Sequence, residues 1–397
     1  MAKILVLDGH SAAALAVTRS AGRAGHWVAI GANRGTFAAA KLSRFCQRSF
    51  EYPVSTEDAD AFLESILEFV RGHAIDLVFP ITDWTLGPLS AQRERFSGIC
   101  RLALPPHNSL EIASDKYRTI QLAESLGIKV PGTWLIESSS DLAVLEEISF
   151  PAVVKDRFSV RWLDGKAVFG SVAYAYSQND LEDRVTERLR AAGDVLIQEF
   201  VSGRGIGFSC FIVNGQAFLP FQWQRIREVD PRGSASSCRR SIPLHEQIVS
   251  LSSQLIAQIG FEGIAMVEYK KTKDDRLVLM EINGRPWGSI ALPIACGIDY
   301  PTYLVDRCLQ GTVPPKAIAY NTGITCRRVV SELSHLSNVR AGRPTAWPGE
   351  YPSFWSTLVK MSVPWYPGMR YDDLWLSDLR PGIAEIRNWF RVRIKRH

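Results

Sequence analysis

Short apolar runs alternate with helical segments over the first 105 residues, and this alternation limits what the chain can fold into. The expected strands and helices lie at residues 3–8, 27–32, 77–81 and 101–104, and at 11–24 and 58–70. This order is typical of a parallel sheet with helices on both faces. The loop Gly9–Ala13 lacks the Gly-x-Gly-x-x-Gly fingerprint, so we expect a Rossmann-like fold that does not bind a nicotinamide dinucleotide.

The expected secondary structure changes after this region, and the composition changes again nearer the carboxy terminus. From about residue 113 to 311 strands dominate and helices are few, which predicts an α+β domain. Beyond it, five of the 11 tryptophans and many prolines lie in the last 57 residues. We therefore predict an α/β domain at 1–112, an α+β domain at 113–311, and a separate, irregular, Trp-rich appendage at 312–397.

The net charge of +5 is a property of the carboxy-terminal end. The last five charges are all basic: Arg387, Arg391, Arg393, Lys395 and Arg396. The rest of the chain is neutral, so no nucleic-acid partner is expected. The seven scattered cysteines predict neither a disulfide framework nor a zinc site. The sequence shows no signal peptide and no spanning apolar run, which predicts a cytoplasmic protein.

The same end of the chain predicts a basic amphipathic helix. Its apolar positions Ile383, Ile386, Phe390 and Ile394 follow helical spacing, and Arg387, Arg391 and Lys395 form a neighbouring stripe. Two interpretations remain open. The helix packs on its own domain with a solvated basic face, or it docks peripherally on an anionic membrane surface.

Two apolar strands joined by the polar turn Lys273–Arg276 carry the most specific chemistry. A turn centred between Asp274 and Asp275 places Glu268 directly opposite Glu281, and strand alternation puts Asn283 on the same face as Glu281. Like charges placed opposite each other destabilise a sheet, so a cation is expected between them. Two carboxylates and an amide oxygen suit Mg²⁺ shared with phosphates, and Arg285 can donate to a phosphate. The alternative is an exposed hairpin whose glutamates point to solvent.

Two lysines and one strand end add to this prediction. Lys155 ends a buried strand, and Lys116 begins a helix, where a cation is unfavourable without an anionic partner. Both suit a nucleotide phosphate, and each could instead be a solvated surface residue. Gln198–Gly203 leaves a strand as an extended segment whose backbone could bind the edge of a purine, or as an ordinary loop junction.

Two loops are further candidates. Arg225 and Arg227, followed by the small residues Gly233, Ser234, Ser236 and Ser237, supply guanidinium groups and backbone N–H groups for an oxyanion. The same stretch could be a flexible solvated loop. Residues 158–170 could form a lid over phosphates or a plain surface hairpin.

The order of these motifs resembles the ATP-grasp superfamily, and within it the carbamoyl-phosphate-synthase-like carboxylate–amine ligases. The motifs are Ser-Asp-Lys116, Pro-Ala-Val-Val-Lys155, Gln-Glu199-Phe-Val201, Glu268, and Glu281-Ile-Asn283-Gly-Arg285. The resemblance runs from Met1 to about Gln310. It implies a Rossmann-like pre-ATP-grasp domain followed by an ATP-grasp fold whose two α+β subdomains clasp ATP.

The resemblance also implies roles for individual residues. Lys116 and Lys155 would contact ATP phosphates, and Glu199, Phe200 and Val201 would bind the adenine. Glu268, Glu281 and Asn283 would ligate Mg²⁺ or Mn²⁺. Arg285 would stabilise the transferring phosphoryl group, Arg225 and Arg227 would hold the carboxylate substrate, and the loop Gly233, Ser234, Ser236 and Ser237 would lie near the acyl phosphate.

Carboxylate–amine ligases of this kind join a small-molecule carboxylate to an amine through an acyl phosphate and release ADP and phosphate; many are homodimers. Three rival functions remain open at this point. The chain could be an ATP-dependent carboxylase or a kinase on the same scaffold, or a non-catalytic nucleotide-binding protein. The sequence has no Met-Lys-Met biotinylation motif, which disfavours a self-contained biotin enzyme.

Overall fold

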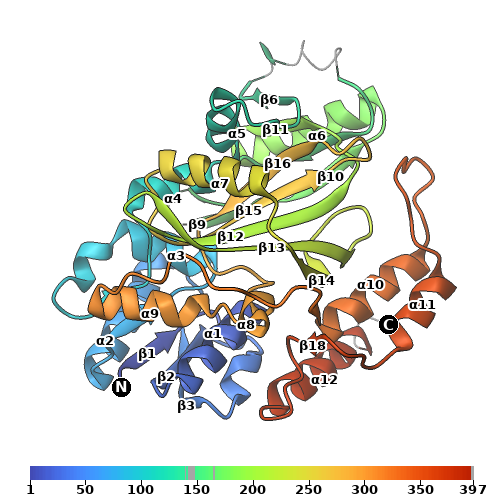
Figure 1. Cartoon of the computed structure of the whole chain (residues 1–397). Helices are drawn as coiled ribbons and strands as arrows, with labels where there is room; N and C mark the ends of the chain where they lie inside the picture. The colour runs from blue at the N-terminus through green and yellow to red at the C-terminus, as the bar shows by residue number, and fades with distance from the viewer. Residues whose placement is uncertain (139, 142–147, 164–165, 395–397) are drawn as a thin grey trace.

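The computed structural model describes residues 1–138, 140–141, 148–163 and 166–394. The amino-terminal domain lies at the bottom of Figure 1 and the largest sheet crosses the middle of the molecule. A smaller sheet lies above it, and the carboxy-terminal segment forms the lower right part. All seven cysteines are free thiols.

The amino-terminal domain is a five-stranded parallel sheet in the order β3-β2-β1-β4-β5. Its strands are β1 Lys3–Val6, β2 Trp27–Asn33, β3 Cys46–Tyr52, β4 Leu77–Phe79 and β5 Arg101–Leu102. Its helices are α1 Ala12–Arg23, α2 Ala59–His73 and α3 Asp83–Ala91, with the short 3₁₀ helices Ala39–Leu42 and Arg93–Phe96. This parallel sheet confirms the predicted α/β order.

The helices cover both faces of this sheet because side chains alternate along each strand. Ile4 and Val6 pack with α1, whereas Leu5 packs with α2. The sequence analysis missed β3 and α3. Strand β3 is a mostly exposed edge strand, and α3 contains Pro88 and shows little amphipathic pattern.

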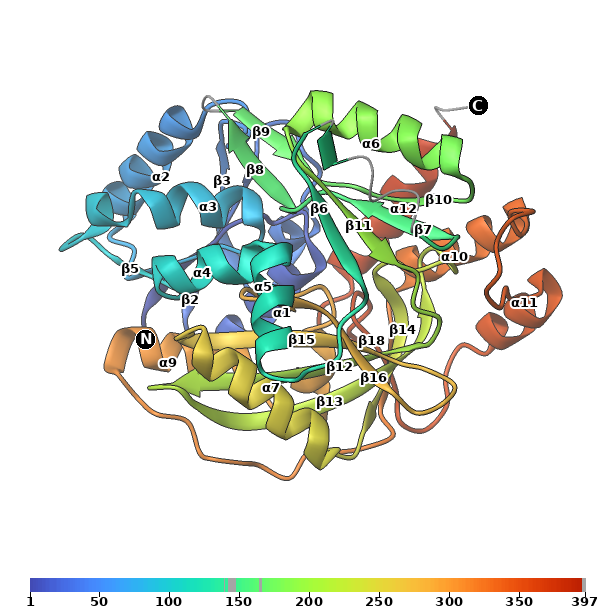
Figure 2. The same ribbon diagram turned by 90° about the horizontal axis from the view of Figure 1, so that it is seen from above.

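A four-stranded antiparallel sheet, in the order β10-β7-β11-β6, forms the smaller subdomain. Its strands are β6 Thr133–Ile136, β7 Ala152–Lys155, β10 Val172–Ala175 and β11 Val195–Glu199, and α6 Gln178–Ala192 packs on it. A separate hairpin, β8 Val160–Leu163 and β9 Lys166–Phe169, projects from it toward the amino-terminal domain and lies near α3 in Figure 2. Helices α4 His107–Ser114 and α5 Lys116–Ser125 connect the domains.

The largest sheet has seven strands in the order β16-β15-β12-β13-β14-β17-β18. They are β12 Arg204–Val213, β13 Gln216–Glu228, β14 Ser236–Ile242, β15 Gly263–Lys271, β16 Leu277–Asn283, β17 Thr325–Arg327 and β18 Met369–Tyr371. One face packs against α7 Glu246–Gln258 and the α4–α5 region. The other face shares a continuous core with the amino-terminal domain, α8 Ala291–Cys296 and α9 Tyr300–Gln310.

The carboxy-terminal segment is less separate than its sequence indicates. It contributes β17 and β18 to the largest sheet, together with α10 Val329–Ala341, α11 Phe354–Ser362 and α12 Arg380–Ile394. Arg19 of α1 forms a fully buried ion pair with Asp378 at 2.8 Å. Such long-range pairing has no signature in the sequence, because a salt bridge depends on the fold and not on spacing.

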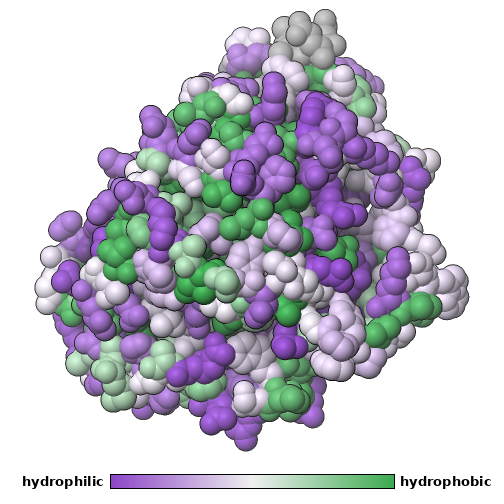
Figure 3. Space-filling view, viewed as in Figure 1, coloured by the Kyte–Doolittle hydropathy of each residue, from purple (hydrophilic) through white to green (hydrophobic). Residues whose placement is uncertain are grey.

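Helix α12 packs on the rest of the carboxy-terminal segment with one face and exposes apolar side chains on another. Trp389 donates from Nε1 to Ser334 of α10 at 3.0 Å, and Glu385 pairs with Arg328 at 2.6 Å. Ile383 and Phe390 are exposed, and Lys395 and Arg396 lie outside the described residues. Within the described part of the chain, none of the helices has the length and apolarity needed to cross a membrane. Hydrophobic residues on the face shown in Figure 3 lie in small groups among hydrophilic ones.

Candidate functional site

The acidic hairpin pairs as predicted, but for a reason that the sequence does not show. Strands β15 and β16 place Glu268 opposite Glu281, and Met266 opposite Asn283. Nearer the turn, however, Lys271 faces Leu277, so the turn is centred on Asp274 and not between two residues. A bulge between Glu268 and Tyr269 shifts the register by one residue and restores the predicted pair.

Arg225 of β13 supplies part of the positive charge that this pair requires. Its guanidinium donates to both carboxylate oxygens of Glu268 and, at 2.9 Å, to Glu228. Burial raises the pKa of Glu268 to about 7; Arg225 opposes this rise and Glu281 adds to it. Burial alone would lower the pKa of Arg225, but the charges of Glu268 and Glu228 outweigh it and raise that pKa.

Glu281 and Asn283 form the other half of a possible cation site. Asn283 donates from Nδ2 to Glu281 Oε1 at 3.0 Å, which confirms that the two side chains share a face. Among the described residues no group of three or more His, Cys, Asp or Glu side chains is arranged to hold a metal. Two facing carboxylates with an amide that can turn its oxygen inward nevertheless fit a hard cation such as Mg²⁺ that takes its remaining ligands from phosphates.

The two predicted lysines lie at this hairpin. Lys155 ends β7 with 7% of its surface exposed, and Lys116 is the first residue of α5. Lys116 donates from Nζ to Ser159 at 3.1 Å and to the Asp156 carbonyl at 3.3 Å. Burial lowers the pKa of both ammonium groups, and the charge of Glu281 opposes the shift in each. The pKa of Lys155 falls to about 8, because Lys116 adds to the effect of burial.

This pKa leads to a test of Lys155. The ammonium is charged below pH 8 and loses its charge as the pH rises through about 8. The resemblance implies that an ATP phosphate binds here, so we expect the dissociation constant for ATP to increase by about fivefold between pH 7 and pH 9.5, since the neutral amine no longer attracts phosphate. Lys155→Arg should flatten this increase, because arginine stays protonated throughout. Calorimetric titration of ATP at several pH values measures both; equal pH dependence in the two proteins would contradict the assignment.

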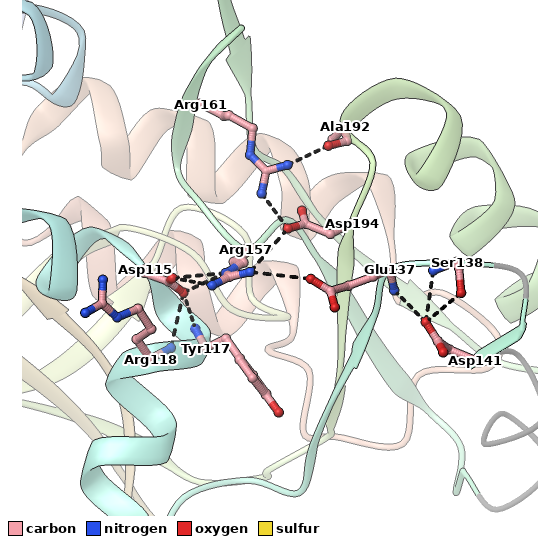
Figure 4. Close-up of polar contacts among 10 residues, drawn as sticks. All are labelled: Asp115, Tyr117, Arg118, Glu137, Ser138, Asp141, Arg157, Arg161, Ala192 and Asp194. Carbon is pink, nitrogen blue, oxygen red and sulfur yellow. Dashed lines mark hydrogen bonds and ion pairs between the residues drawn. The ribbon is translucent and has the colours of Figure 1, made fainter.

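A cluster of ion pairs joins the start of α5 to the base of the β8–β9 hairpin (Figure 4). Asp115 accepts from the backbone N–H groups of Tyr117 and Arg118, and so caps the N-terminus of α5. The same carboxylate binds Arg157, with the shortest contact at 2.7 Å. Asp194 lies 3.6 Å from Arg157 and 2.5 Å from Arg161, so it joins this group to β8 and to the start of β11.

Arg285 leads from the hairpin to the amino-terminal domain. Its Nε donates to Asp83 Oδ1 at 2.8 Å. Asp83 begins α3, just after β4, and the sequence analysis did not single it out. The available signal was an acidic residue past the carboxyl end of a parallel strand, which is where α/β sheets place their ligand sites.

The predicted adenine-binding segment is occupied by contacts within the protein. Lys270 donates from Nζ to the Val201 carbonyl at 2.7 Å, and the N–H of Glu199 donates to the Gly132 carbonyl at 2.8 Å. The Phe200 ring packs edge-on against Trp347 of the carboxy-terminal segment, with centroids 5.0 Å apart. The segment therefore lies beside Lys270, at the turn end of the β15–β16 hairpin.

The structure divides the predicted substrate residues into two groups. Ser234 lies beside Arg225, whose guanidinium donates to the Ser234 carbonyl at 2.8 Å. Gly233 has a positive φ of 131°, which glycine adopts readily. Arg227 instead binds Glu332 of α10, with Nε 3.0 Å from Oε1, and Ser237 donates to the same carboxylate. Ser236 donates to the Cys238 carbonyl. Arg227 and Ser237 thus tie the largest sheet to the carboxy-terminal segment.

The predicted lid forms the β8–β9 hairpin. It docks on the amino-terminal domain, since the N–H of Ala167 donates to the Thr56 carbonyl at 3.0 Å and Phe169 packs edge-on against Trp84 at 5.3 Å. Residues 164 and 165 lie outside the described residues. A cavity of about 660 Å³ lies between this hairpin, α3, α4 and β16, with Lys116, Glu281, Asn283 and Arg285 in its wall.

Comparison with known proteins finds related sequences and folds. A family model described as "ATP-grasp in the biosynthetic pathway with Ter operon" matches residues 192–331. The D-alanine–D-alanine ligase of Pseudomonas entomophila is 24% identical over 185 residues, which cover 44% of this chain and 55% of the ligase. This chain thus spans about half the length of that relative.

Solved structures match over more of the chain. An L-amino acid ligase from Bacillus licheniformis aligns with a TM-score of 0.59 and 17% identity over 78% of this chain and 74% of that one. The chain has the ATP-grasp fold. The biotin carboxylase domain of the Hydrogenobacter thermophilus 2-oxoglutarate carboxylase, solved as a dimer with MgADP and bicarbonate, aligns at 0.64 and 16% identity over 81% of this chain and 73% of that one.

The resemblance of the sequence to the ATP-grasp superfamily is therefore confirmed, and so is the predicted fold class. In this chain the smaller sheet carries Lys155 and the largest sheet carries the acidic hairpin. The comparisons give no support to the alternative in which α12 docks on a membrane surface.

Proposed function

We propose that this chain is an ADP-forming ligase that uses ATP to join a carboxylate to an amine. The observation that carries the proposal is the facing pair Glu268 and Glu281, with Asn283 beside Glu281. Lys116 and Lys155 lie close enough for the charge of Glu281 to raise their pKa values against the effect of burial. Carboxylates and ammonium groups so placed can hold a metal and the phosphates of a nucleotide at one point.

The donor set suits one or two Mg²⁺ or Mn²⁺ ions, held by Glu268, Glu281 and Asn283. When bound, the metal would neutralise phosphate charge. Lys116 and Lys155 would hold phosphate oxygens. Arg225 keeps Glu268 in place beside Glu281 and would share it with the cation.

The order of residues along the β15–β16 hairpin indicates the line along which the phosphoryl group would be transferred. Lys270 lies at the Val201 end, Glu268 and Glu281 lie midway, and Arg285 lies at the Asp83 end. With the adenine at Val201, ADP leaves toward that end. The attacking group must approach in line from the opposite side, which is the side of Arg285.

The chemistry then follows in two steps. A carboxylate oxygen attacks the γ-phosphorus of ATP as the bond to the β–γ bridging oxygen breaks, giving an acyl phosphate and ADP. The amine next attacks the acyl carbon, phosphate leaves, and the amine loses a proton. The protein contributes positioning and charge, and no covalent side chain is required.

The test is to trap the acyl phosphate. The full chain is incubated with MgATP, hydroxylamine and a panel of amino acids, dipeptides, sugar acids and simple carboxylic acids. We expect ADP release that depends on one class of acid, with a hydroxamate formed in equal amount. ADP release with bicarbonate alone would indicate a carboxylase, a stable phosphorylated product a kinase, and nucleotide binding without ADP a non-catalytic protein.

A further inference from the structure

The 660 Å³ cavity continues from the proposed reaction centre into the amino-terminal domain. Its inner end holds Glu281, Asn283 and the Arg285–Asp83 ion pair. Its other walls come from α3, α4 and the β8–β9 hairpin, which lie far apart in the sequence. A volume of this size is typical of sites that bind small molecules.

The charged groups around this cavity are mostly paired with one another. Arg285 is bonded to Asp83, and Arg157 to Asp115. His107 lies 3.6 Å from Glu111 at the outer end. Leu86 of α3 and Leu110 of α4, both less than a tenth exposed, also line the cavity, together with polar residues such as Ser90 and Thr119.

Trp162 of β8 completes the apolar wall, and the opposite helix is shaped to receive it. A Cβ atom built at Gly87 of α3 would lie 2.9 Å from Trp162 Nε1, closer than side chains normally approach. Glycine inside a helix costs about 1 kcal/mol relative to alanine. Gly87 therefore makes helix α3 less stable than alanine would, but it allows the indole to approach closely. This contact keeps Trp162 in the wall of the cavity.

We infer that this cavity is the specificity pocket for the carboxylate substrate, and that the substrate carries an apolar alkyl or aryl body. This inference rests on the proposed function, which places the attacking carboxylate at the Arg285 end. The carboxylate lies at Arg285, and the body of the acid extends between Leu86, Leu110 and Trp162. Apolar walls reject a second charged group, because its desolvation would not be compensated.

The test compares two acids of similar length, 3-phenylpropanoate and glutarate, by calorimetric titration into the full chain with MgADP present. We expect 3-phenylpropanoate to bind about tenfold or more tightly than glutarate. Trp162→Ala should weaken its binding about tenfold and leave ADP binding within about twofold. Trp355→Ala is the matched control, since this residue is 71% exposed on α11, and it should change neither affinity.

Gly87→Ala provides a second variant whose folding is favoured, since alanine stabilises the helix. Its Cβ should displace Trp162 and weaken 3-phenylpropanoate binding in the same direction. Equal or tighter binding of glutarate, no binding of either acid, or an unchanged affinity in Trp162→Ala would each overturn the inference.

The hydroxamate assay separates this inference from the proposed function. If 3-phenylpropanoate binds through Trp162 and no acid yields ADP or hydroxamate, the pocket is confirmed and the ligase proposal is wrong. If only polar or dicarboxylic acids yield hydroxamates, the ligase proposal holds and the apolar pocket is wrong.

Discussion

Glu281→Gln should abolish Mg²⁺-dependent ATP turnover while the protein remains folded. The amide keeps the shape of the side chain and its contact with Asn283, but removes one of the two facing negative charges. In the proposed reaction Glu281 ligates the metal, and loss of such a carboxylate removes several kcal/mol of transition-state stabilisation, so we expect turnover to fall by about 1000-fold or more. Steady-state ADP release measures the loss, and circular dichroism with thermal unfolding checks the fold.

Glu124→Gln is the matched control, because Glu124 is exposed on α5. It carries the same change of charge and should leave turnover unaffected. Full activity in Glu281→Gln would show that the acidic hairpin does not take part in the reaction. Equal losses in both variants would show that the effect comes from net charge and not from the site.

Arg225→Met should destabilise the fold by about 3 kcal/mol at pH 8, because breaking one partner of a buried ion pair leaves the other charge uncompensated. Arg225 contacts both Glu268 and Glu228, and its side chain is 19% exposed. Glu268 also faces Glu281, and its ion pair with Arg225 is the one it makes among the described residues, so its charge would lose that compensation. Urea unfolding monitored by tryptophan fluorescence measures the difference in unfolding free energy.

The destabilisation should depend on pH in a defined direction. Burial already raises the pKa of Glu268 to about 7, and loss of Arg225 raises it further. A carboxyl whose folded pKa exceeds its unfolded value of about 4.3 weakens the fold as the pH rises between those two values. Glu268 of the unsubstituted protein also takes up its proton as the pH falls through about 7, so the deficit of Arg225→Met should shrink between pH 8 and about pH 6 and stay constant from there to pH 5.

A double variant tests whether the pair is responsible. Arg225→Met with Glu268→Leu removes both charges, so it should be more stable than Arg225→Met alone. An Arg225→Met deficit that is the same at pH 5 and pH 8, or a double variant less stable than the single one, would contradict this account. Either result would show that Arg225 acts through packing and not through charge.

The sequence predicted most of the candidate site because its residues lie in regular strands. Alternation along β16 fixes Glu281 and Asn283 on one face, and a hairpin brings Glu268 opposite at short range. Lys155 closes an apolar strand, and Asp115 caps the helix that begins with Lys116. These are local rules, so they can be applied before any tertiary contact is known.

Other features could not be predicted in this way. The bulge that sets the register of Glu268 leaves no mark in an apolar strand. Arg285 donates to Asp83, which is 202 residues away in the sequence, and Arg227 donates to Glu332, which is 105 residues away. No spacing rule links residues so far apart in the chain. The sequence therefore assigned Arg227 to the substrate loop, whereas the structure pairs it with α10.

The sequence by itself determined the α/β order, the acidic hairpin and the two lysines, because hydrophobic periodicity and strand alternation act within a few residues of each position. Only the tertiary structure decided which charges neutralise one another and how Leu86, Leu110 and Trp162 come to line one cavity. It also joined the Trp-rich segment to the largest sheet. Such contacts depend on burial, which is a property of the whole fold and not of any local pattern.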